Sequence, residues 1–157
     1  MRKYMICIFS VLIGLMGCRA QVPEGQLQSI EYTTTGTMAG YIYEGRAEQN
    51  PDGSFTLKSK KENYGPLYCK QISRADMDSL SQIIIDEKMY KYKERYLPKF
   101  EVLDGESWHF HATFSDGTHI SSSGSNAWPG GSGLSRIQSY LQKLIAGSDS
   151  IVEEKED

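Results

Sequence analysis

The stretch WHFHATFSDGTHIS, residues 108–121, decides the fold, because its first seven side chains are alternately apolar and polar. Apolar residues alternate with histidine and threonine, which is typical of a strand with one buried and one polar face. A type I turn with Gly117 as a left-handed bulge pairs Ala112 with Ile120 and keeps Ile120 on the apolar face. A two-residue turn would instead pair Ile120 with Thr113 and mix the two faces. The sequence therefore predicts a β-hairpin in the first of these registers.

The chain before this hairpin carries further strand patterns. Apolar and polar residues alternate in a region rich in Thr, Tyr and Ile, which suits half-buried strand positions. The sequence Asn-Pro-Asp-Gly at 50–53 places proline at the second position of a turn and glycine at its end, which predicts a second hairpin. The expected strands span 30–34, 41–49, 55–58 and 66–72, with a further short strand at 100–103.

Two segments have the 3.6-residue apolar spacing of amphipathic helices. The first should run from 74 to 89 and begin at a capping pair formed by Ser73 and Asp76. The second should begin at Ser132 and stop at Gly147. Their apolar stripes are Met77, Leu80 and Ile84, and Leu134, Ile137, Leu141 and Leu144. Runs of strands that are each closed by a helix predict an α+β fold, with a single antiparallel sheet of about six strands and two helices packed on one face.

The first 18 residues carry an independent signal. Arg2 and Lys3 precede an apolar run from Met5 to Leu15, which is shorter than the roughly 20 residues of a membrane-spanning helix. The sequence Leu-Met-Gly-Cys at 15–18 follows. It resembles the lipobox of bacterial lipoproteins, although Met16 is larger than the residue usual at its position. The resemblance implies removal of the signal peptide, residues 1–17, and acylation of Cys18 by chains such as palmitate.

This resemblance implies a cellular location and a domain organisation. The mature protein would be held by its lipid in the bacterial cell envelope, and Arg19, where an aspartate would favour the inner membrane, favours the outer membrane. Residues 18–28 would form the lipidated tether, 29–147 the α+β domain and 148–157 an acidic tail. Loss of Arg2 and Lys3 changes the net charge from −3 to −5, which disfavours nucleic acid as a partner. Cys69 would then lack a disulfide partner, and we expect it to be buried as a small hydrophobe.

The segment 104–129 is similar to a module found in uncharacterised bacterial secreted proteins and lipoproteins. The similarity rests on Asp104-Gly105, Trp108, Phe114, Asp116-Gly117, Ser123-Gly124, Asn126 and Pro129. These are mostly turn and core residues, so the similarity supports the fold and implies no activity. The chain also lacks a G-x-S-x-G elbow, an H-E-x-x-H motif and a P-loop. We therefore expect a non-catalytic binding or interaction module.

All three histidines, His109, His111 and His119, fall on the polar face of the predicted hairpin. Three imidazole nitrogens at about 2.1 Å, with water as the fourth ligand, could hold a zinc ion in an enzymatic or sensory site. The simpler interpretation is a solvent-facing sheet surface, because no carboxylate is placed by its spacing to orient the rings. We expect no cofactor, with zinc as the alternative.

Two further segments carry aromatic residues outside regular structure. Trp128, close to Asn126 in a Gly/Ser-rich loop, either folds down to seal the core edge, which is the simpler expectation, or stays exposed to bind a glycan or an envelope protein. Tyrosines and basic residues alternate at 88–99, a pattern that can bind nucleic acid or anionic headgroups. Glu94 dilutes that run, so we expect a solvated helix end with its rings packed inward.

Overall fold

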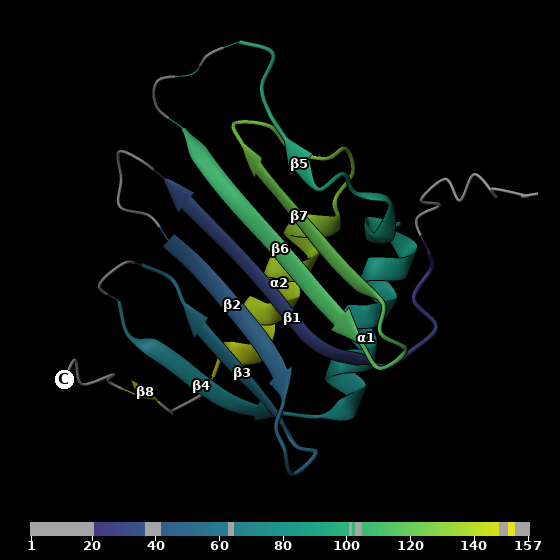
Figure 1. Ribbon diagram of the computed structural model, residues 1–157. Coiled ribbons are helices and arrows are strands. Elements are labelled where there is room, and N and C mark those ends of the chain that lie inside the picture. The colour runs from purple at the N-terminus through teal and green to yellow at the C-terminus, as the bar shows by residue number, and fades with distance from the viewer. Residues whose placement is uncertain are drawn as a thin grey trace, which may run out of the picture.

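The computed structural model describes residues 21–36, 42–62, 65–100, 102, 105–147 and 151–152. The predicted signal peptide, Cys18 and most of the acidic tail lie outside the described residues. Figure 1 shows one sheet with both long helices behind it. The elements are β1 (Leu27–Gly36), β2 (Ile42–Gln49), β3 (Phe55–Lys60), β4 (Leu67–Ile72), α1 (Arg74–Asp86), the 3₁₀ helix η1 (Met89–Lys91), β5 (Arg95–Tyr96), β6 (Glu106–Phe114), β7 (His119–Ser125), α2 (Gly133–Ile145) and β8 (Ile151–Val152). Among these residues, no helix is long and apolar enough to cross a membrane.

The strands form a single sheet in the order β5-β7-β6-β1-β2-β3-β4-β8, which confirms the α+β class. The expected sheet differs in two respects. It has eight strands rather than about six, and β5 runs parallel to β7 while the other described pairs are antiparallel. Both extra strands, β5 and β8, contain two residues, which is too short to show an alternating pattern. The strand expected at 100–103 is not formed at Phe100 or Val102, and Glu101 and Leu103 lie outside the described residues.

The hairpin of β6 and β7 has the predicted register. Ala112 lies opposite Ile120, and Gly117 adopts the left-handed conformation with φ at 83°. The Phe114 N–H donates to the Thr118 carbonyl at 2.9 Å and closes the turn. The apolar face is therefore buried, with Phe110 and Ala112 fully inaccessible. The turn at 50–53 is also confirmed, with φ of Gly53 at 85°.

Helix α1 begins as predicted and ends earlier. The Ser73 hydroxyl accepts from the Asp76 N–H at 3.2 Å, and the Asp76 carboxylate accepts from the Ser73 N–H at 2.8 Å, which completes a capping box. The helix stops at Asp86 rather than at residue 89, because Lys88 turns into the left-handed region with φ at 53°. The left-handed residue leads directly into η1, whose Met89 is fully buried.

The N-terminus of α2 is capped by a residue that is distant in the sequence, rather than by the side chain of Ser132. Ser132 makes no side-chain capping bond to the helix. Instead the Glu87 carboxylate, at the end of α1, accepts from the Ser132 N–H at 3.2 Å and from the Arg136 guanidinium at 2.7 Å. The Arg136 hydrogen bond is the largest effect that lowers the pKa of Glu87. A carboxylate at this position also offsets the positive end of the helix dipole.

The chain before β1 is fastened to the turn of the β6–β7 hairpin. The Asp116 carboxylate accepts from the backbone N–H groups of Glu24 and Gly25, each at 2.9 Å, and also from that of Thr118. These bonds lower the pKa of Asp116 to about 2, and the bond from Thr118 has the largest effect. β1 begins at Leu27, so the folded part of the chain reaches into the segment predicted as tether.

The helices cover one face of the sheet, and none of the described elements covers the opposite face, which we call the open face (Figure 1). The core includes the inward side chains of the strands together with residues of the helices, among them Met77, Leu80, Ile84, Ile137 and Leu141. Because β6 alternates, its histidines and Thr113 lie on the open face. Cys69 faces the same side, opposite Lys58, and is half-buried rather than buried as expected.

Candidate functional site

The loop after β7 is held by two sets of hydrogen bonds. Asn126, with φ at 50°, donates its N–H to the Glu106 carbonyl at 2.8 Å, and its side-chain oxygen accepts from the Glu106 N–H at 3.0 Å. The indole N–H of Trp108 donates to the Ala127 carbonyl at 2.8 Å. These hydrogen bonds therefore fix the backbone up to Ala127, the residue that precedes Trp128.

Trp128 projects from this fixed base and keeps 47% of its surface exposed. A cavity of about 260 Å³ and another of about 290 Å³ both have Trp128, Tyr32 and Gln138 in their walls. We call Trp128 and these two cavities the Trp128 site. The first cavity is completed by Thr34, Thr35 and Glu106, and the second by Tyr92, Pro129, Gly131, Leu134 and Ser135.

The chemistry of the Trp128 site combines a large aromatic ring with polar side chains. Gln138 offers both a donor and an acceptor, and Glu106 offers a carboxylate. The Thr34 hydroxyl is buried and has no hydrogen-bond partner within the described residues. Burial raises the pKa of Tyr92, with smaller effects from Tyr96 and Glu87, to about 12, so its hydroxyl stays a neutral hydrogen-bonding group at physiological pH.

These positions revise the expectations for the loop. The prediction that Trp128 seals the core edge is wrong, because about half of the side chain remains exposed beside α2. Asn126 is not in the walls of either cavity, and its side-chain oxygen is bonded to Glu106. Sequence reasoning missed Tyr32 and Gln138, since one looks like an ordinary strand residue and the other like a polar position on an amphipathic helix.

The three histidines share the open face, as the predicted register requires. His119 lies opposite Thr113, and His111 lies between Ser121 and Glu31 on the neighbouring strands. The rings of His109 and His111 are nearly parallel, with centroids 6.4 Å apart.

Burial lowers the pKa of His111 most, the charges of His109 and His119 lower it further, and Glu31 opposes them. In the described part of the chain, no three His, Cys, Asp or Glu side chains gather in a way that could hold a metal ion. This finding does not test the zinc hypothesis, which stays a prediction.

The segment at 88–99 separates its aromatic and basic side chains. Tyr90, Tyr92 and Tyr96 pack against the core, as expected, while the lysines and Arg95 are exposed. The expected helix end is replaced by η1 and β5. Tyr96 lies against Trp108 with ring centroids 5.7 Å apart, and Tyr92 meets Tyr96 edge-on.

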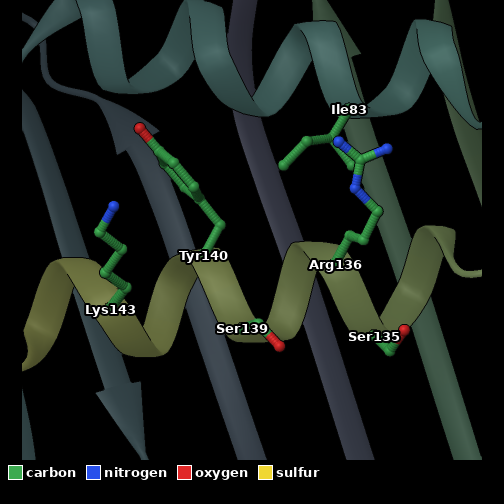
Figure 2. A pocket seen from close by; sticks show the side chains of 6 residues that line it. All are labelled: Ile83, Ser135, Arg136, Ser139, Tyr140 and Lys143. Atoms are coloured by element: carbon green, nitrogen blue, oxygen red, sulfur yellow. The ribbon is translucent and has the colours of Figure 1, made fainter.

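A third depression, of about 350 Å³, lies between the two long helices. Figure 2 shows Arg136, Tyr140 and Lys143 reaching from α2 towards α1, whereas Ser139 points away. Arg136 is bonded to Glu87, and the Tyr140 hydroxyl donates to Asp76 at 3.5 Å. Two of these polar groups therefore already serve the contact between the helices, and we regard this groove as structural.

No protein-family model matches this chain, and no curated protein matches it.

Proposed function

We propose that this chain is a lipid-anchored protein of the bacterial envelope whose Trp128 site binds a glycan without converting it chemically. The observation that carries the proposal is the half-exposed Trp128 ring, with cavities that share Tyr32 and Gln138 in their walls. An aromatic face can stack on the apolar face of a sugar ring, and amide and carboxylate groups beside it can bond the hydroxyls. The lipid anchor rests on the lipobox resemblance at Cys18.

The dimensions of the site favour a sugar over a protein partner. Each cavity is slightly smaller than the roughly 300–1,000 Å³ of pockets that hold drug-sized molecules. A volume of about 260–290 Å³ suits one sugar residue in each cavity. A stable protein interface buries about 800 Å² on each partner around several anchoring residues. In the Trp128 site, Trp128 is the one exposed large hydrophobic residue that the structure describes.

The acidic groups of the site favour binding over hydrolysis. Glycoside hydrolases use two carboxyl groups that flank the scissile bond. Among the described residues in the walls of the two cavities, Glu106 alone carries a carboxylate. A single carboxylate can accept hydrogen bonds from sugar hydroxyls, but it does not provide an acid paired with a base or nucleophile.

The test is a panel of soluble oligosaccharides titrated against the protein, with isothermal titration calorimetry as the measurement of affinity in every variant and tryptophan fluorescence of the parent as the measurement of contact with Trp128. The chain has two tryptophans, and Trp108 is only 3% exposed, so acrylamide quenching reports mainly on Trp128. Trp128→Ala should abolish binding and Trp128→Phe should retain part of it. Phe100→Ala, which removes an exposed aromatic ring outside the site, should leave binding unchanged.

A panel without any binding sugar, or a sugar that binds Trp128→Ala as tightly as the parent, would refute the glycan proposal. The anchor is tested separately by mass spectrometry of the mature amino terminus, where we expect a diacylglyceryl group on Cys18.

A further inference from the structure

The chain that follows β5 exposes three large apolar side chains within six residues, 97–102. Leu97, Phe100 and Val102 are 59%, 82% and 47% exposed. We call these three residues the apolar tip. They make up three of the five exposed large hydrophobic residues in the described part of the chain. Single exposed apolar residues are normal on a protein surface, whereas a cluster marks an interaction site.

Basic residues flank the apolar tip. Lys93, Arg95 and Lys99, which we call the basic flank, are all exposed. Residues 88–100 contain five cations and one carboxylate, while the whole chain has a net charge of −3. Positive charge is therefore concentrated on the chain that leads into the apolar tip, whereas the carboxylates of Glu101, Asp104 and Glu106 follow in the sequence.

The base of this segment is fixed to the sheet. The Ser123 N–H donates to the Glu94 carbonyl at 2.9 Å, and the Ser122 hydroxyl donates to the Lys93 carbonyl at 2.6 Å. The Tyr96 ring packs against Trp108 just before the apolar tip begins. Figure 1 shows the chain after β5 extending past the end of the sheet. The apolar tip therefore projects from a rigid support.

We propose that the apolar tip inserts into the interface of a lipid bilayer and that the basic flank contacts its anionic headgroups. Interfacial binding combines buried apolar area with electrostatic attraction to anionic lipids, and this segment presents both together. Single-stranded nucleic acid would instead require several exposed rings for base stacking, whereas Phe100 is the one exposed aromatic ring among the described residues of 88–102 and the tyrosines pack against the core. This contact is separate from the Trp128 site and does not require an acyl chain.

Vesicle binding by a protein without its acyl chain tests the proposal. The protein is the chain without residues 1–17 and with Cys18→Ser. We expect it to fold, because every core residue that the structure describes lies between Leu27 and Ile145. Co-sedimentation is measured with phosphatidylcholine–phosphatidylglycerol vesicles and with pure phosphatidylcholine vesicles. We expect binding to the anionic vesicles that weakens as salt is added.

Two triple variants and one control separate the apolar and the electrostatic parts. Leu97→Ser, Phe100→Ser and Val102→Ser together should weaken binding about tenfold or more, because the inserted apolar area is lost. Lys93→Gln, Arg95→Gln and Lys99→Gln together should reduce binding to the level seen with neutral vesicles. Val22→Ser, at another exposed apolar residue, should bind like the parent. Phe100→Trp adds a direct probe, whose emission should shift to the blue when vesicles are added.

Two results would overturn the proposal. One is a parent protein that does not bind anionic vesicles at low salt. The other is a tip variant that binds them as tightly as the parent, which would point to a protein as the occupant of the apolar tip. Because the substituted side chains are exposed, unchanged urea unfolding midpoints would show that the variants remain folded.

Discussion

Gly124 should be intolerant of any side chain, because the Trp108 indole crosses directly over it. Gly124 lies opposite Trp108 in the β6–β7 pair. A Cβ atom at this position would lie 2.3 Å from the Trp108 Nε1 atom and 2.3 Å from the Ala127 carbonyl oxygen. Those two atoms are the donor and the acceptor of one hydrogen bond. The methyl group of Gly124→Ala would therefore occupy the space of this bond.

Two effects set the expected loss of stability. Forcing a methyl group into a packed region costs about 1–3 kcal/mol. Leaving a buried indole N–H without a partner costs about 1–3 kcal/mol more. Alanine also restricts the unfolded chain more than glycine does, which favours the folded state by about 0.4–1 kcal/mol. We therefore expect Gly124→Ala to reduce the free energy of unfolding by roughly 1–5 kcal/mol, and the Trp108 emission of the folded protein to shift to the red.

The assay is urea unfolding followed by tryptophan fluorescence, with Gly130→Ala as the matched control. Gly130 is on the same loop, has no atom within 4 Å of an added Cβ and is not among the residues with positive φ. Its substitution should change the free energy of unfolding by less than about 0.5 kcal/mol. Equal unfolding midpoints for the two variants would show that the Trp108–Ala127 hydrogen bond does not pass over Gly124, and the reasoning would fail.

Two further predictions concern pH. The pKa of Asp116 is lowered from 3.8 to about 2 in the folded protein, so its contribution is complete above 3.8 and is lost as the pH falls towards 2. Urea unfolding between pH 2 and 5 should show this loss in the parent and not in Asp116→Ala, and identical profiles would contradict it. The pKa of His111 lies below 6.5, so the folded state loses stability as the pH falls below that value. NMR titration should place the His111 midpoint below 6.5, and lower still in Glu31→Gln; a midpoint at or above 6.5 would refute the assignment.

The strongest sequence predictions were those in which residues close in the chain determine the outcome. The register of the β6–β7 hairpin followed from the alternation of Phe110 and Ala112 with polar residues and from the glycine at 117. The capping box of α1 needs only Ser73 and Asp76, three positions apart. In both cases a slip would either expose the core or leave backbone groups unpaired, so local chemistry leaves few alternatives.

The candidate site was only partly visible in the same patterns. Trp128 was recognised, but its exposure depends on how the loop packs beside α2 and β1. Tyr32 and Gln138 are 106 positions apart, and only the folded sheet brings both into the walls of the same cavities. Neither residue carries a local signal that separates it from an ordinary strand or helix position.

The sequence by itself determined the α+β class, the register of the β6–β7 hairpin, the start of α1 and the polar face that carries the histidines. Tertiary structure alone decided that Arg95 and Tyr96 form a parallel strand, that Glu87 caps α2 and that Trp128 stays exposed. The physical reason is the range of the forces involved. Periodicity, turns and capping boxes act within a few residues, whereas Glu87 and Ser132 are 45 positions apart and bond only after the sheet and helices have packed.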